Sequence, residues 1–240
     1  MEVVHSVFMA VELPKSLALA YTKLVFDYKV FKYPKAVEMM KDFAKQWGFV
    51  EKKAFEGVRE FTGLKPRDAI EMRFIPTDRR TKDLPIIIPR NYAKEIIIPF
   101  RPTAESIRRI NEHVIDSLTY CVLRQHLDGE LQDDIGIWLI EMHSFVIGAQ
   151  LAGIMRSRGK GRETRRKSPQ ETRALLSDNE TRRLLSEFLH ERKVQLPHGL
   201  VQDDVFKIIA NEYSRVRNYD GKQWLLRIHG RVTRRSRRVR

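Results

Sequence analysis

Apolar residues recur at helical spacing in the first part of the chain. From Pro34, which suits the first turn of a helix, an apolar stripe through Trp47 predicts a helix that stops at Gly48. A second short helix is predicted over 51–62, with Gly63 at its end. Before these helices, residues 2–13 alternate loosely and favour a strand. The apolar segment 17–31 is ambiguous between helix and strand, and we expect a helix there.

The pattern changes to short apolar runs between Leu64 and Pro102. Two runs of three isoleucines, at 85–89 and 96–99, are bounded by prolines. Isoleucine is β-branched and favours strands, and the residues between the runs suit a hairpin loop. The sequence therefore predicts a β-hairpin near 85–99.

Two long helical patterns follow the predicted hairpin. The first spans 103–126 and the second spans 132 to about 155, with the turn Asp128-Gly129 between them. Helices joined by so short a loop pack antiparallel as a helical hairpin. We expect this pair to supply the main core of the first domain.

The second of these patterns contains an apolar run at 135–155 that is long enough to raise the question of a membrane span. Glu141, His143 and Gln150 interrupt the run. A charged side chain in the middle of a bilayer is costly, so a span of this composition is disfavoured. The sequence therefore predicts a buried core helix.

The C-terminal part of the chain carries shorter helical patterns. Helices are predicted over 178–193 and 201–216, joined by a seven-residue turn, an arrangement compatible with a helix-turn-helix. Asp203 and Asp204 argue against insertion of the second helix into a DNA groove, because base contacts usually come from the helix N-terminus and a carboxylate repels phosphate. Residues 223–232 fit either a wing strand or a last helix.

Together these patterns predict a mainly α protein with a small β-hairpin element, which is the α+β class. A long antiparallel helix pair precedes a small C-terminal helical module that is compatible with helix-turn-helix. The length allows one large domain or two small ones. The predicted division is a mainly helical N-terminal domain at 1–154, a basic flexible linker at 155–173, a small helical module at 174–228 and an Arg-rich tail at 229–240.

Positive charge is concentrated in two segments. Residues 156–173 carry eight Lys or Arg against two Glu, and residues 227–240 carry seven Arg and no acid. The first block has a net charge of +6 and the second a net charge of +7, so together they account for +13 of the formal net charge of +14. No apolar side chain lies between Met155 and Ala174. We expect that segment to be mobile, because it cannot bury enough surface to offset its ordering entropy.

The composition of the two basic blocks indicates a polyanionic partner. Arginine makes up 13 of their 15 cations, and its planar guanidinium suits bidentate contact with phosphate. Such an excess of charge goes beyond what solubility needs. A further candidate surface is the outward side of 201–216, opposite its apolar stripe. The candidate nucleic-acid-binding residues are therefore Arg156, Arg158, Lys160, Arg162, Arg165, Arg166, Lys167, Lys207, Asn211, Arg215, Arg231, Arg234, Arg235, Arg237 and Arg238.

Cysteine content and the N-terminal sequence bear on the compartment. Cys121 is the only cysteine, which excludes an intrachain disulfide and a zinc site built on several cysteines. Glu2, His5 and Glu12 interrupt the region where a signal peptide would carry its apolar core. We expect an intracellular protein, cytoplasmic or associated with the nucleus or nucleoid, with no membrane association.

Enzyme signatures are scarce in the sequence. Gly159-Lys160-Gly161 lacks the spaced glycine of a P-loop, and no His-Glu-x-x-His or Gly-x-Ser-x-Gly motif occurs. The two long helices carry carboxylates that could together hold Mg²⁺ for phosphoryl chemistry, but each set lies off the apolar stripe and is expected to be solvated. The two sets are Glu105, Glu112 and Asp116, and Glu130, Asp134 and Glu141. We expect no catalytic residue, no metal and no cofactor.

Tryptophan and histidine positions are interpreted as structural. Trp47, Trp138 and Trp224 are expected in the core, although Trp224, near the final arginines, is also a candidate for base stacking. The histidines interpreted as packed or surface groups rather than ligands are His113, His126 and His143.

These observations favour sequence-tolerant nucleic-acid binding through the phosphate backbone, without catalysis, and with DNA favoured over RNA. Two alternatives stay open. One is a structural protein that packages nucleic acid, as a nucleocapsid does, and forms homo-oligomers through its long helices. The other is a metal-dependent nuclease or transferase that uses the helical carboxylates.

Overall fold

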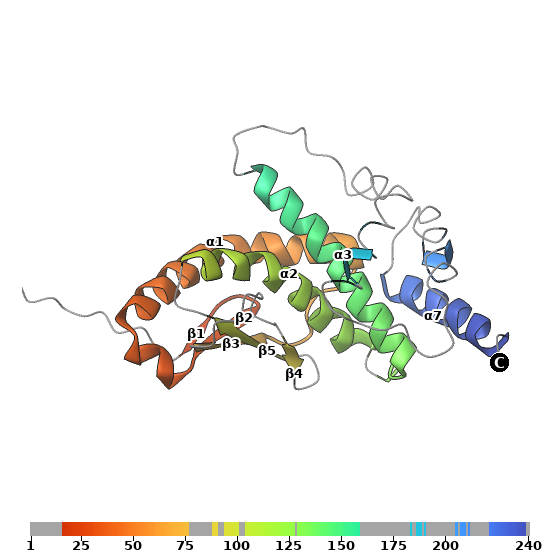
Figure 1. Cartoon of the computed structure of the whole chain (residues 1–240), viewed down its shortest axis with the longest axis horizontal. Coiled ribbons are helices and arrows are strands. Elements are labelled where there is room, and N and C mark those ends of the chain that lie inside the picture. The colour runs from red at the N-terminus through yellow and green to blue at the C-terminus, as the bar shows by residue number, and fades with distance from the viewer. Residues whose placement is uncertain are drawn as a thin grey trace, which may run out of the picture.

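The chain folds as an α+β protein in a computed structural model (Figure 1). The structure describes residues 16–76, 88–90, 94–100, 104–127, 129–158 and 221–238, together with scattered positions between 183 and 211. Long helices dominate, and one mixed sheet lies beneath two of them. The predicted fold class is confirmed at this level, although the sheet is larger than a hairpin.

The sheet has five strands in the order β1-β2-β3-β5-β4. Strands β2, β3 and β5 run parallel, while β1 and β4 pair antiparallel at the two edges. Pairing of β4 with β5 places Ile88 opposite Ile97, so the predicted pairing of the two isoleucine runs is confirmed. The strands are β1 (Ser16–Ala18), β2 (Thr22–Phe26), β3 (Ile70–Pro76), β4 (Ile88–Arg90) and β5 (Glu95–Phe100).

Side chains along the parallel strands alternate between a buried and an open face of the sheet. In β2, Leu24 and Phe26 are buried, whereas the side chain of Lys23 is exposed on the other face. This period of two is the signature of a strand. The prediction of a helix over 17–31 is therefore wrong, because this segment holds parts of β1, all of β2 and a short 3-10 helix, Tyr28–Lys32.

Helix α1 (Pro34–Thr62) connects β2 to β3 and lies over the buried face of the sheet (Figure 1). The predicted break at Gly48 is wrong, because the buried stripe continues from Trp47 to Phe61. A glycine inside a helix costs about 1 kcal/mol relative to alanine, and the long packed stripe offsets that cost. The predicted end at Gly63 is confirmed. Its φ of 74° lies in the left-handed region, and its N–H donates to the carbonyl of Arg59.

A buried carboxylate attaches α1 to the turn between β1 and β2. Glu51 is 3% exposed, and its oxygens accept hydrogen bonds from the backbone N–H groups of Ala20, Tyr21 and Thr22 at 3.1, 3.0 and 2.7 Å. The Thr22 hydroxyl donates to Glu51 at 2.6 Å and accepts the indole N–H of Trp47 at 3.1 Å. The protein itself thus satisfies this buried charge, and the bonds set the position of the turn on α1.

Helices α2 (Ala104–Leu127) and α3 (Asp134–Arg158) occur where the two long helices were predicted, and they pack against each other. At their crossing, a Cβ added to Gly148 would lie 2.4 Å from the Cβ of Asp116, so a larger residue does not fit without a shift of backbone. The described side chains of the apolar run in α3, such as Leu139 and Met142, are buried. Among the helices of the described residues, none combines the length and the apolar character that crossing a bilayer requires.

The buried side chains form two clusters. The first core cluster lies between the sheet, α1 and parts of α2 and α3, and it includes Trp47 and Phe74. The second core cluster surrounds the end of the α2–α3 pair near its connecting loop. There, Trp138 packs with Phe188 and with Trp224 of the last helix in one group. The buried residues described in the C-terminal part, such as Phe188 and Trp224, therefore pack in the same cluster as residues of α2 and α3.

Residues 223–232, for which the sequence allows either a wing strand or a last helix, are helical and belong to the last helix, α7 (Gly221–Arg238). It crosses the predicted boundary between the helical module and the Arg-rich tail. Helix α3 likewise continues to Arg158, inside the segment predicted as linker. The predicted helices at 178–193 and 201–216 lie largely outside the described residues, so the helix-turn-helix stays a prediction, as does the strand at 2–13.

Candidate polyanion-binding surface

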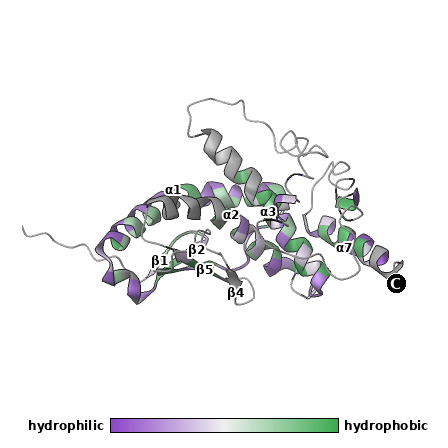
Figure 2. Cartoon of the chain, in the orientation of Figure 1, coloured by the Kyte–Doolittle hydropathy of each residue, from purple (hydrophilic) through white to green (hydrophobic). Residues whose placement is uncertain are grey.

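Helix α7 has one apolar side that docks it onto the rest of the protein. Trp224, Leu225, Ile228 and Val232 are fully buried in the second core cluster. Hydrophobic and hydrophilic residues alternate along its ribbon in Figure 2, as expected for an amphipathic helix. Because these four side chains anchor α7 to α2 and α3, the remainder of its surface keeps a fixed orientation.

Four arginines follow one line along α7. Arg227, Arg231, Arg234 and Arg238 are separated by four, three and four residues, so they lie within about 60° of one another around the helix axis. Arg227 and Arg234 are exposed and Arg231 is partly exposed, while Arg238 is placed on this line by its position in the helix. The helix contains no Asp or Glu. We call these four residues the α7 arginine stripe.

Two polar contacts hold α7 against the loop between α2 and α3. The Lys222 ammonium pairs with Glu130, and the His229 ring contacts the two carboxylate oxygens of Asp133 at 2.8 and 2.9 Å. Asp133 also caps the first turn of α3 by accepting the N–H of Gly136 at 2.8 Å. Burial opposes ionisation of Asp133, but the bonds from His229 and Gly136 outweigh it and lower the pKa of this carboxyl. Glu130 and Asp133 are thus engaged by residues of α7 outside the stripe.

A buried histidine lies under α7. His143 of α3 is 1% exposed, and its ring centroid lies 4.5 Å from that of Trp224. Burial lowers the pKa of His143 to about 3, because the imidazolium ion would lose its hydration there. His143 is therefore a neutral packing residue near neutral pH, in agreement with its interpretation from the sequence.

Acidification should weaken the docking of α7. The unfolded chain takes up a proton at His143 near the ordinary pKa of 6.5, and the folded chain only near 3. Stability from this group is therefore fully present above pH 6.5 and falls as the pH drops toward 3, by about 2 kcal/mol at pH 5. Urea denaturation at pH 7 and pH 5 measures the loss, and a His143→Gln variant should lose about 2 kcal/mol less over the same interval. If the free energy of unfolding changed equally with pH in the wild type and in His143→Gln, the lowered pKa of His143 would be contradicted.

The arginines at the end of α3 do not join the stripe. Arg156 and Arg158 lie in the last turns of α3, whereas Asp133, which contacts α7, lies just before its first turn. At 1.5 Å per residue these two ends of α3 are roughly 35 Å apart. The structure thus places the described part of the first basic block and the stripe at opposite ends of one helix.

The remaining predicted contact residues fall into three groups. Arg235 and Arg237 lie on α7 beside the stripe, and Lys207 and Asn211 are exposed positions of the described C-terminal residues. The candidates that lie outside the described residues are Lys160, Arg162, Arg165, Arg166, Lys167 and Arg215.

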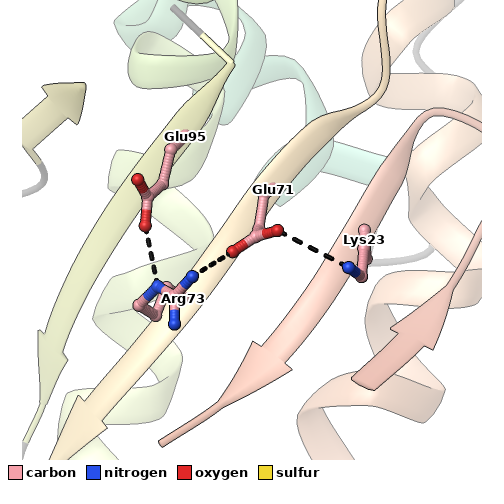
Figure 3. Close-up of polar contacts among 4 residues, drawn as sticks. All are labelled: Lys23, Glu71, Arg73 and Glu95. Atoms are coloured by element: carbon pink, nitrogen blue, oxygen red, sulfur yellow. Dashed lines mark hydrogen bonds and ion pairs between the residues drawn. The ribbon is translucent and has the colours of Figure 1, made fainter. Parts of the chain in front are cut away.

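The open face of the sheet carries a second set of charges, shown in Figure 3. Arg73 donates to Glu71 at 2.5 Å and to Glu95 at 2.7 Å, and the Lys23 ammonium lies 3.6 Å from Glu71. Two cations and two carboxylates thus alternate across β2, β3 and β5, and their charges cancel. Partly exposed pairs of this kind contribute about 1 kcal/mol or less each. This network is therefore a poor attractor for a polyanion.

The considered carboxylates whose side chains the structure describes do not gather into one metal site. Glu130 lies in the loop before α3 and pairs with Lys222, and Asp134 is exposed at the start of α3. Asp116 was expected on a solvated side, and this is wrong because Asp116 is buried against Gly148. In the part of the chain that the structure describes, no three His, Cys, Asp or Glu side chains gather to hold a metal ion.

All three tryptophans are buried, as predicted. Trp224 is 0% exposed, so the prediction that it could serve for base stacking is wrong. The exposed aromatic residue that the sequence interpretation missed is Phe49 on α1, with 73% of its side chain accessible. Lysines one helical turn away on both sides were the available signal.

No family model, no curated protein and no solved structure matches the chain. The assignment of function therefore depends on the residues and contacts described above.

Proposed function

We propose that the chain binds nucleic acid through the phosphate backbone, with the α7 arginine stripe as the central contact and DNA as the favoured partner. The observation that carries this proposal is an acid-free line of arginines on a helix whose opposite side is buried. A merely solvated tail would need neither the docked helix nor a common direction for its arginines.

The chemistry of the stripe suits phosphate. Guanidinium groups form paired hydrogen bonds with phosphate oxygens, and a docked helix presents them with little further loss of entropy. The four arginines extend over about 16 Å of helix axis. The major groove of B-DNA admits an α-helix, whereas the deep groove of duplex RNA is too narrow for one. These dimensions favour DNA over duplex RNA.

The two alternative functions gain no support from the described residues. A metal-dependent nuclease or transferase would need gathered carboxylates, and those described do not gather. Assembly through the long helices would need apolar surface left uncovered, and the described apolar side chains of α2 and α3 are largely buried within the chain. Nucleic-acid binding is therefore the function that we pursue.

The salt dependence of binding tests the proposal. We expect a fluorescently labelled duplex of about 20 base pairs to bind, and its association constant to fall by about 10³- to 10⁵-fold between 50 and 200 mM salt if six to ten phosphates are contacted. A duplex of scrambled sequence should bind equally well, and duplex RNA more weakly. Anisotropy titrations measure all three. No binding at the lowest salt, or binding that ignores salt, would overturn the proposal.

A further inference from the structure

A second basic surface lies on α1, around an exposed aromatic ring. Phe49 is 73% exposed, the most exposed large apolar side chain among the described residues. Lys45, Lys52 and Lys53 lie four residues before it and three and four residues after it, and all are exposed. Residues at these spacings are neighbours on one side of a helix. Within the described residues none of the three lysines forms an ion pair.

A glycine leaves open space next to the ring. Apart from its two chain neighbours and the nearby backbone of α1, no atom lies within 4 Å of the Cβ that an alanine would place at Gly48, and its φ is not in the left-handed region. Glycine destabilises a helix interior, and neither close packing nor backbone conformation requires it here. Gly48 lies between Lys45 and Lys52 on the surface of α1, so the missing side chain opens a gap beside Phe49. We call Lys45, Gly48, Phe49, Lys52 and Lys53 the α1 patch.

We infer that the α1 patch binds single-stranded nucleic acid, with one base stacked on Phe49 and the flanking phosphates held by the lysines. Every base has a flat face that can stack on an aromatic ring, and a cationic surface beside the ring follows the backbone. Lys45 and Lys52 are separated by about 10 Å along the axis, one on each side of the gap at Gly48. The inference rests on nucleic acid as the partner class and adds a surface that prefers unpaired bases.

The surroundings of the patch favour this occupant over a membrane. Asp42 and Glu56, two turns before and after Phe49 on the same side, are exposed and bound the patch with negative charge. The apolar side of α1 is buried in the first core cluster, so Phe49 would be a solitary anchor. Helices that bind membrane surfaces need a continuous apolar side. A short, acid-bounded site suits one base with its neighbouring phosphates better.

Variants of Phe49 separate stacking from simple apolar contact. In the full chain, Phe49→Leu removes the aromatic face and Phe49→Tyr keeps it. We expect Phe49→Leu to weaken binding of a labelled oligothymidylate by about 5- to 20-fold and to change duplex binding less than about twofold, because duplex bases already stack on one another. Phe49→Tyr should bind as the wild type does. Phe31→Leu, at another exposed aromatic residue, is the matched control and should have no effect.

Two further measurements locate the contact. Gly48→Leu should improve helix propensity yet fill the gap, so weaker single-strand binding by this variant cannot come from unfolding. An oligonucleotide carrying 5-iodouracil should crosslink on irradiation to the tryptic peptide 46–52, which contains Phe49. Crosslinks confined to other peptides would contradict the inference.

The outcomes distinguish this inference from the proposed function. If the wild type binds neither single-stranded nor duplex DNA, both fall. If it binds both while Phe49→Leu and Gly48→Leu match the wild type, only the α1 inference falls. If Phe49→Leu lost affinity equally for single-stranded and for duplex DNA, the stacking of a base on Phe49 would be ruled out. If Phe49→Leu lost binding to vesicles containing phosphatidylserine while its oligonucleotide binding stayed intact, the patch would be assigned to a membrane surface instead.

Discussion

Replacing Glu51 with glutamine should lower the melting temperature of the protein by roughly 6–12 °C. Glu51 accepts four hydrogen bonds, three of them from backbone N–H groups of the β1–β2 turn. The amide of glutamine turns one acceptor oxygen into a donor, which leaves at least one backbone N–H of the turn facing another N–H. Losing charge-assisted bonds and leaving donors unsatisfied costs about 3 kcal/mol. Thermal unfolding followed by circular dichroism measures the effect.

The same helix provides a matched control for Glu51. Glu56→Gln makes the identical chemical change at an exposed position of α1, and it should shift the melting temperature by no more than about 1–2 °C. Thr22→Val removes the hydroxyl that links Glu51 to Trp47, so its effect should not add to that of Glu51→Gln. If Glu51→Gln and Glu56→Gln melt at the same temperature, the buried network does not stabilise the turn.

Much of the helical structure follows from periodicity. The spacing of apolar residues located α2, α3 and most of α1, and Gly63 marked the end of α1 through its left-handed backbone. The isoleucine runs located β4 and β5 because β-branched residues bounded by prolines have few other conformations that they favour. These features depend on residues close together in the sequence, and local rules therefore suffice.

Features that depend on distant partners were not predictable from the sequence. Segment 17–31 has apolar residues at both spacings, and what makes Thr22–Phe26 a strand is its pairing with Ile70–Phe74 of β3, about 48 residues away. Helix α1 continues through Gly48 because buried residues lie on both sides of it. Nothing near Glu51 in the sequence indicates that it is buried, since its partners come from a turn some 30 residues earlier.

The candidate binding residues likewise include some that composition alone reveals and others that only the structure reveals. Charge counting located the arginines of α7, because an uncompensated block of cations is visible in composition alone. The line that Arg227 forms with Arg231, Arg234 and Arg238 became definite only with the helix, since 223–232 was equally compatible with a strand. Phe49 was missed because the predicted helix end at Gly48 removed it from the helix on which its lysine neighbours lie.

Alanine at all four positions of the α7 arginine stripe should weaken binding of duplex DNA by about 10²- to 10³-fold near 0.1 M salt, equally for all sequences. Each phosphate contact contributes about 0.9 to the slope of log K against log salt, so the slope should flatten by about 3–4. Alanine favours helix, and Trp224, Leu225, Ile228 and Val232 remain to dock α7, so the fold should persist. Anisotropy titrations at several salt concentrations measure both quantities.

Two further variants separate the contribution of the stripe from that of net charge. Alanine at Lys35, Arg59, Lys65 and Arg67 removes the same charge from exposed positions elsewhere and should reduce affinity less than about tenfold, because separated surface charges are screened. Lysine at the four stripe positions keeps the charge but loses the planar fork, so the salt slope should persist while affinity falls moderately. If the stripe and control variants lose affinity equally, binding follows net charge and α7 is not the contact surface.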